Sequence, residues 1–137
     1  PTMVWSRRGV TDLNKALWSG WAVIGPERRF YFAGDTGMFS GFREIGRRLG
    51  PFDLAALPIG AYSPTEMMAP SHLNPEQAIS AALDLNANRS VAIHFGTFDL
   101  SDEPLDEPAR RFAAASRDAD RGSERDWVLK IGETRLW

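Results

Sequence analysis

Two short segments decide the fold of this chain: Phe32-Ala-Gly-Asp-Thr-Gly37 and Ser90-Val-Ala-Ile-His-Phe-Gly-Thr97. Each segment reads as a short apolar strand that ends on a potential metal ligand, which is Asp35 in the first and His94 in the second. Small, turn-forming residues follow: Thr36-Gly37 directly after Asp35, and Gly96-Thr97 one residue beyond His94. A side chain at a strand end is held by a rigid sheet and faces an open edge, where binding sites are usually built. We therefore predict a binding site at one rim of a β-sheet.

The composition limits both the class of protein and the kind of metal site. A chain of 137 residues has the length of one domain. Its net charge of -2 argues against a nucleic-acid partner, because a phosphate backbone requires a basic surface. The absence of cysteine excludes disulfides and thiolate zinc sites, and two histidines cannot supply a full zinc shell in the usual way. No apolar run reaches membrane-spanning length. We expect a cytoplasmic location, with peripheral contact to a membrane as the alternative.

Hydrophobic spacing and turn residues predict an alternating order of strands and helices. Gly25-Pro26-Glu27 favours a hairpin, Gly50-Pro51 ends a helix, and Asn74-Pro75-Glu76-Gln77 begins one. The stretch 59–71 is a long loop, of the kind that is often functional. The order is typical of an α/β layer with a mixed sheet. The predicted elements are strands 17–24 and 28–33, a helix over 39–49, a strand over 54–58, a helix over 74–85, a strand over 90–93, a helix over 103–116, and a final hairpin of 127–131 with 134–137.

Each candidate residue also has an ordinary structural interpretation. Asp35 before Thr36-Gly37 could simply form a turn, because Asp and Gly are favoured there for backbone reasons. A lone histidine at the end of an apolar strand, such as His94, is often a hydrogen-bonded core residue. His72 lies just before a predicted helix and could be part of its entry, or it could bind an anion there with the help of the helix dipole. The residue types alone leave these alternatives open.

Several short blocks, in order along nearly the whole chain, resemble the second half of a metallo-β-lactamase-fold hydrolase. The closest likeness is to the branch of N-acyl-phosphatidylethanolamine-hydrolysing phospholipase D and its bacterial relatives. The match of many blocks in order is more specific than any one of them. The blocks are Leu17-Trp18-Ser19-Gly20-Trp21, Phe32-Ala33-Gly34-Asp35-Thr36-Gly37, Gly50-Pro51-Phe52-Asp53-Leu54-Ala55, Leu57-Pro58-Ile59-Gly60-Ala61-Tyr62, His72-Leu73-Asn74-Pro75-Glu76 and Ile93-His94-Phe95-Gly96-Thr97-Phe98.

The resemblance implies a fold and a set of roles. The family fold is an αββα sandwich with two divalent metals, expected to be zinc, at its edge. Residues 1–137 would form one αβ half, with a mixed sheet and helices on one face. Asp35 would bridge the two metals and His94 would bind the second one. His72 would contact the substrate phosphate or the developing oxyanion, and Tyr62, in the loop 60–71, would line the substrate pocket.

Two departures from the family pattern bear on activity. The His-X-His-X-Asp-His motif of the first half is absent from this chain, and Val4 stands where relatives carry a metal-binding histidine. The resemblance implies a hydrolase that directs a metal-activated water at a lipid or small-molecule phosphodiester, and the 137-residue chain alone is expected to be inactive. The alternative is a degenerate binding or structural module without catalysis. Because half a sandwich exposes an apolar sheet face, we also predict a homodimer, or pairing with the missing half.

Overall fold

The computed structural model describes residues 5–6, 10–11, 15–17 and 19–137, and its main feature is a five-stranded mixed sheet. The order in this sheet is β3-β4-β5-β6-β7, and β1 pairs with β2 in a separate two-stranded sheet. Only the β3–β4 pair is antiparallel in the larger sheet, whereas β4, β5, β6 and β7 run parallel. The strands are β1 (Trp5–Ser6), β2 (Ala16–Leu17), β3 (Trp21–Ile24), β4 (Arg29–Phe32), β5 (Phe52–Pro58), β6 (Ala87–Ile93) and β7 (Asp126–Trp127). The helices are α1 (Gly41–Leu49), α2 (Thr65–Met68), α3 (Pro75–Asp84) and α4 (Glu107–Asp118).

Local signals explain where several elements begin and end. The β3–β4 hairpin closes with a hydrogen bond of 2.8 Å from the Gly25 amide to the Arg28 carbonyl. Helix α3 begins with a complete capping box, in which the Asn74 side chain accepts from the Gln77 amide and the Gln77 side chain accepts from the Asn74 amide. These were the sequence signals for a hairpin and a helix start, and both predictions are confirmed.

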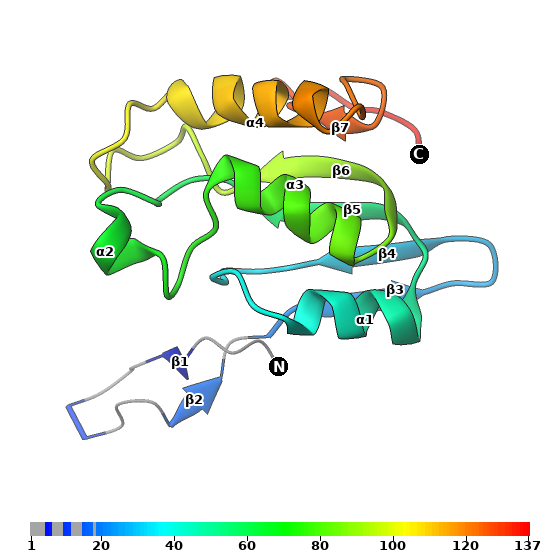
Figure 1. Ribbon diagram of the computed structural model, residues 1–137, viewed down its shortest axis with the longest axis horizontal. Helices are drawn as coiled ribbons and strands as arrows, with labels where there is room; N and C mark the ends of the chain where they lie inside the picture. Colours follow the sequence, from blue (N-terminus) through cyan, green and yellow to red (C-terminus); the bar gives the residue numbers. More distant parts are fainter. Residues whose placement is uncertain (1–4, 7–9, 12–14, 18) are drawn as a thin grey trace.

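The core lies between the sheet and one layer of helices. Helices α1, α3 and α4 lie side by side in front of the sheet, with α3 in the middle (Figure 1). Ala55 and Leu57 of β5 face these helices and are fully buried. The largest fully buried side chains include Phe42 of α1, Phe52 of β5 and Phe112 of α4. The predicted α/β architecture, a mixed sheet with helices on one face, is confirmed.

Four sequence predictions about individual elements need correction, three of them in the first part of the chain and in the loops around the site. The single strand predicted over 17–24 is two strands, β2 and β3, which belong to different sheets; Trp18 between them lies outside the described residues. The predicted loop 59–71 contains the short helix α2. The helix predicted over 103–116 begins later, at Glu107, because the Glu103 side chain turns inward and accepts hydrogen bonds from the backbone of residues 61 and 63.

The final hairpin predicted over 127–137 is also wrong. Asp126–Trp127 pairs in parallel with β6, and residues 128–137 form no strand. The reason is tertiary: Asp126 is buried and bonded to Ser90 of β6, Ser116 of α4 and Arg121, which fixes β7 beside β6. The tail then crosses toward β4, where the Trp137 ring lies 5.9 Å from that of Phe30. No helix in the described part of the chain has the length and apolar character needed to cross a bilayer.

Candidate metal centre

Three neighbouring parallel strands each lead into one of the predicted site residues. Asp35 lies shortly after β4, His94 directly follows β6, and His72 lies in the segment that connects β5 to α3. The carboxyl ends of adjacent parallel strands meet at one edge of a sheet, which is where ligands bind in open α/β folds. The sheet topology therefore brings together residues that are far apart in the sequence.

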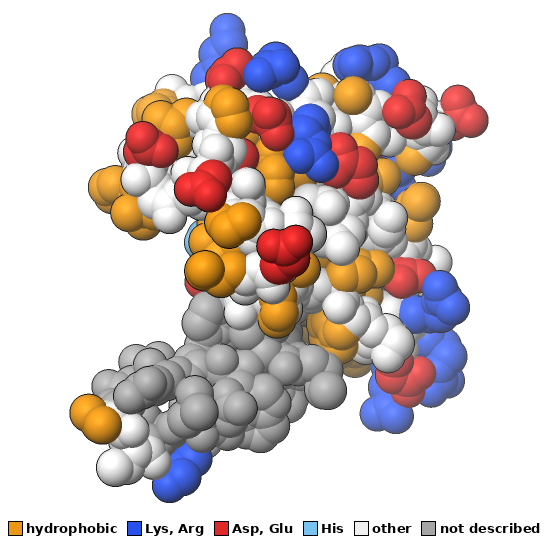
Figure 2. All heavy atoms as spheres, turned by 60° about the vertical axis from the view of Figure 1, so that its left-hand side comes forward, with side chains coloured by type: hydrophobic (Ala, Val, Ile, Leu, Met, Phe, Trp, Pro, Cys, Tyr) orange, Lys and Arg blue, Asp and Glu red, His pale blue; other side chains and the backbone are white. Residues whose placement is uncertain are grey.

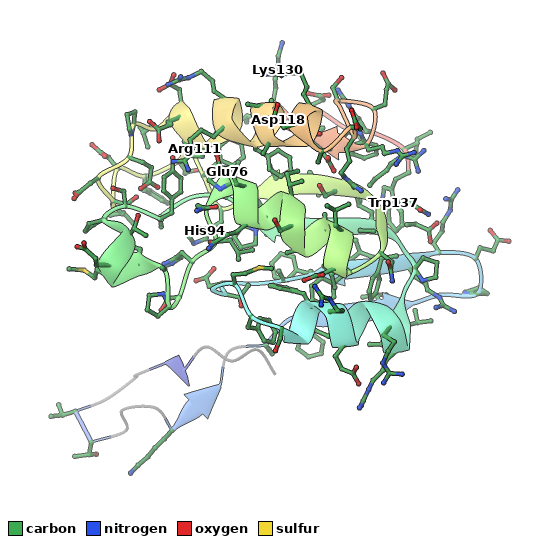
Figure 3. The ribbon with its side chains drawn as sticks, in the orientation of Figure 1. Glu76, His94, Arg111, Asp118, Lys130 and Trp137 are labelled. Carbon is green, nitrogen blue, oxygen red and sulfur yellow. The ribbon has the colours of Figure 1, made fainter. Side chains whose placement is uncertain are left out.

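The three side chains form one cluster. Asp35, His72 and His94 each offer one ligand atom, and these atoms all lie within 4.8 Å of one another. The His94 Nε2 atom lies 3.3 Å from Asp35 Oδ1, and the rings of His72 and His94 stack at 5.5 Å between centroids. The side chains of His94 and Asp35 are 37% and 39% exposed, so the cluster opens to solvent. His94 lies at the left end of the sheet in Figure 3, beside the connecting loops.

The backbone is specialised where these loops meet. His94 has φ of +59°, in the left-handed region that non-glycine residues rarely adopt and that often marks functional sites. Gly60 packs so closely on this turn that a Cβ atom there would lie 2.3 Å from the His94 carbonyl oxygen. At Gly37, a Cβ atom would lie 2.5 Å from the carbonyl oxygen of Ala69, shortly before His72. These two glycines let the loops that carry the cluster approach one another.

His72 is held in the neutral form, which can bind a cation or a polar group of a substrate. Burial, and then the neighbouring His94, hold the pKa of His72 below its usual value, so the neutral ring is favoured. Its Nδ1 atom is buried and has no hydrogen-bond partner among the described residues. An unpaired buried polar nitrogen costs about 1–3 kcal/mol, which a bound cation would offset. Neutral imidazole and carboxylate oxygen are both ligands of divalent zinc, so this donor set fits a metal ion.

The structure does not bring Tyr62 into the cluster. Its side chain is 6% exposed, and its hydroxyl donates a hydrogen bond of 2.7 Å to Glu107 Oε1. The Arg111 guanidinium lies 4.7 Å from the centre of the Tyr62 ring and also pairs with Glu76 and Glu107. Figure 3 shows Arg111 beside Glu76, above His94. Burial and the bond to Glu107 raise the pKa of Tyr62. A substrate contact of Tyr62 stays a prediction.

A cavity of about 280 Å³ adjoins the cluster, and sequence reasoning missed most of its wall. Gly60 and Ala61 of the predicted pocket loop line it together with His94, but the rest of the wall comes from residues 95–108. The available signal was Phe98 and Leu100, two large apolar residues in a polar segment without helical or strand periodicity. Glu103 was interpreted as the start of a helix, although its carboxylate holds the turn at residues 61 and 63.

This chain is similar to known proteins in sequence and in fold. Residues 1–95 match the profile of the family described as Beta-lactamase superfamily domain. Over 95 residues, 69% of this chain, the sequence is 53% identical to N-acyl-phosphatidylethanolamine-hydrolyzing phospholipase D 1 of Caenorhabditis elegans and covers 27% of it. It is also 36% identical over 107 residues, 78% of this chain, to a UPF0173 metal-dependent hydrolase of Listeria monocytogenes, and covers 40% of that protein.

A solved structure gives the same result for the fold. The metallo hydrolase Igni18 of the archaeon Ignicoccus hospitalis superposes with a TM-score of 0.66 and 27% identity, over 89% of this chain and 46% of the other. The predicted fold class, one αβ half of a metallo-β-lactamase sandwich, is therefore confirmed. The chain spans just over a quarter of the length of the Caenorhabditis relative and about half of Igni18. The profile match and the identities show that this chain belongs to the β-lactamase superfamily.

Proposed function

We propose that this chain supplies part of the metal centre of a metal-dependent hydrolase that acts on phosphodiesters of the phospholipase D type. One observation carries the proposal: three ligand-type side chains, from the segments that follow three adjacent parallel strands, converge within 4.8 Å. The relatives named phospholipase D and metal-dependent hydrolase support the class of reaction. The predicted substrate is a lipid or small-molecule phosphodiester, and the predicted metal is zinc. A cytoplasmic location remains part of the proposal.

The residues would divide the work by their chemistry. Asp35 can face two cations with its two carboxylate oxygens, as a bridging ligand must, and His94 would bind one of them. His72 would hold the substrate phosphate or the charge that develops on it. A divalent cation, when bound, makes a hydroxide nucleophile available near neutral pH and stabilises negative charge on the phosphoryl oxygen. His94 Nε2 and Asp35 Oδ1 lie 3.3 Å apart, which is close enough for both to bind the same cation.

The remaining ligands of a dinuclear site would come from the family's first-half motif, on a segment outside residues 1–137. With only Asp35 and His94 as metal ligands, we expect this chain to bind zinc or manganese weakly and to show no turnover. The alternative, a degenerate module, was favoured by Val4, which lies outside the described residues. The contact of 3.3 Å between His94 Nε2 and Asp35 Oδ1 also supports it, since the two groups can partly satisfy each other without a metal.

Calorimetric titration with zinc separates the two functions. The metal-centre proposal expects weak but measurable binding that the Asp35→Asn variant lowers at least tenfold, because amide oxygen is a poorer ligand than carboxylate. The matched control is Asp53→Asn, a partly exposed aspartate that pairs with Arg28 and lies near the start of β5, at the opposite end of that strand. Equal zinc affinity in wild type and Asp35→Asn would favour the degenerate module.

A further inference from the structure

The cavity beside His94 has the shape and lining of a site for an apolar group. Its volume of about 280 Å³ lies just below the range of about 300–1,000 Å³ that is usual for drug-sized ligands. Such a volume holds one short chain or one ring system rather than both chains of a lipid. Phe95, Phe98, Leu100 and Leu105 contribute to its wall. All of them except Phe95 lie beyond residue 95, where the match to the family profile ends.

The charged groups of the lining do not offer a site for a charged ligand. The titratable side chains among the residues that line the cavity are His94 and Glu103. Glu103 is 8% exposed, and its two carboxylate oxygens accept hydrogen bonds from the amides of Ala61 and Ser63. Its charge is therefore satisfied by the backbone of the wall. The remainder of the lining that the structure describes favours an uncharged, apolar occupant.

Large apolar side chains are unusually exposed around this opening. Phe98, Leu100 and Leu105 are 74%, 80% and 45% exposed. Figure 2 shows hydrophobic side chains gathered on the flank that carries the loops at the left of Figure 1, next to the visible edge of a histidine side chain. A single exposed leucine needs no explanation, but several that converge on one cavity mark a binding site.

The cavity and the candidate metal centre share a residue. His94 belongs to the cluster with Asp35 and His72 and also lines the cavity. A group that sits at the cluster can therefore extend directly into the cavity. We infer that residues 95–105 bind a short apolar chain or ring of the substrate, attached to the group that lies at the metal centre. That this apolar group is part of a substrate held at the metal centre rests on the proposed function. The binding of an apolar group in the cavity does not.

A series of straight-chain alcohols, from butanol to decanol, tests the apolar site without any metal or reacting group. Nuclear magnetic resonance can follow the methyl signals of Leu100 and Leu105 during each titration. Each added methylene should raise the affinity roughly three- to fourfold until the cavity is full, after which the affinity should level off. Affinity that does not depend on chain length, or shifts confined to signals outside residues 60–61 and 94–108, overturns the proposal.

Two leucine variants locate the site. Leu105→Asp should weaken octanol binding at least tenfold, because it places a charge in the apolar wall. Leu136→Asp is the matched control, since Leu136 is 97% exposed and does not line the cavity, and it should leave octanol binding unchanged. Leu100→Asp, at a more exposed position, replaces Leu105→Asp if that variant does not fold. Equal losses in the cavity variant and in Leu136→Asp contradict the assignment.

The link to the metal centre has its own test. With zinc present, octyl phosphate should bind wild type at least tenfold more tightly than octanol, and this advantage should disappear in Asp35→Asn. If octanol binds as expected but octyl phosphate gains nothing, the apolar site stands and its connection to the proposed function is wrong. If octanol fails while zinc still binds, the apolar site alone is wrong.

Discussion

At the scale of single residues, the pair of Arg121 and Asp126 is the most deeply buried salt bridge among the described residues. The two side chains are 6% and 0% exposed, and Asp126 also accepts hydrogen bonds from Ser90 and Ser116. Removal of one partner from a buried, hydrogen-bonded pair costs about 3–5 kcal/mol, because the other charge is left unpaired. The pair therefore ties β7 to β6 and α4.

We predict that Arg121→Ala lowers the free energy of unfolding by about 3–5 kcal/mol. The matched control is Arg110→Ala on α4, which removes a pair with Asp106 whose arginine is 66% exposed. That exposed pair should contribute less than about 1 kcal/mol. Denaturation by urea measures both values. Similar losses for the two variants would mean that burial does not determine the strength of these pairs.

The sequence predicts the part of the candidate site that follows from ligand-type residues placed at or near the ends of apolar strands. Asp35 lies shortly after β4 and His94 directly after β6, and the segment that follows the parallel strand β5 brings His72 to them. The sequence predicts that Tyr62 lines the substrate pocket, and its contact with substrate stays a prediction. What the sequence does not reveal is that its hydroxyl donates a hydrogen bond to Glu107 of α4. The choice of such a partner is a tertiary effect, which no local pattern in the loop contains.

At the scale of elements, the turn at residues 60–63 depends on one distant carboxylate. Glu103 accepts from the amides of Ala61 and Ser63, and the Asp102 amide donates to the Ser63 carbonyl. Ala61 has φ of +62°, a conformation that local preference does not favour. Residues 102–103, between β6 and α4, thus hold residues 61–63, between β5 and α2, in place beside the candidate site.

We predict that Glu103→Ala loses about 1–3 kcal/mol of stability, because two amides lose their acceptor. Hydrogen exchange at Ala61 and Ser63 should become faster. Asp102→Ala is the control, since this neighbouring, exposed carboxylate takes no part in the turn and only the Asp102 backbone does. Unchanged exchange at both amides in Glu103→Ala would show that the turn does not need this residue.

The sequence predicted the elements that local chemistry defines and missed those that distant contacts define. The hairpin at Gly25-Pro26, the end of α1 at Gly50 and the capping box at Asn74 are local, and each was predicted. The prediction of a final hairpin failed because Asp126 bonds to Ser90 and Arg121, which both lie outside the predicted hairpin. The prediction that a helix begins at residue 103 failed because the Glu103 side chain accepts a hydrogen bond from the Ser63 amide in another loop.

At the scale of the whole molecule, one face of the sheet is only partly covered. Trp21 of β3 lies opposite Phe32 of β4, on the face away from the helices, and Val23 lies opposite Phe30. Trp21, Val23 and Phe32 are 66%, 58% and 39% exposed. The Trp137 ring lies against Phe30, so the tail reaches this face without burying its outer strands.

We predict that two copies pair through this face, and that Trp21→Asp converts the dimer to a monomer at micromolar concentration. A charge at the centre of an apolar interface prevents its desolvation. Leu83→Asp on the helical side, where Leu83 is 52% exposed, should leave the dimer intact. Light scattering measures both. A monomeric wild type contradicts the homodimer and leaves pairing with the missing half as the remaining form of this prediction.

The central claim is that Asp35 and His94 hold a divalent cation at one edge of the sheet, with His72 beside them. Paramagnetic broadening by manganese tests it most directly, because broadening detects weak binding and locates it. At submillimolar manganese, the ring signals of His72 and His94 and the amide signals of residues 34–36 should broaden first, and Asp35→Asn should abolish this preference. If those signals persist while signals near exposed carboxylates elsewhere broaden, the cluster is not a metal centre.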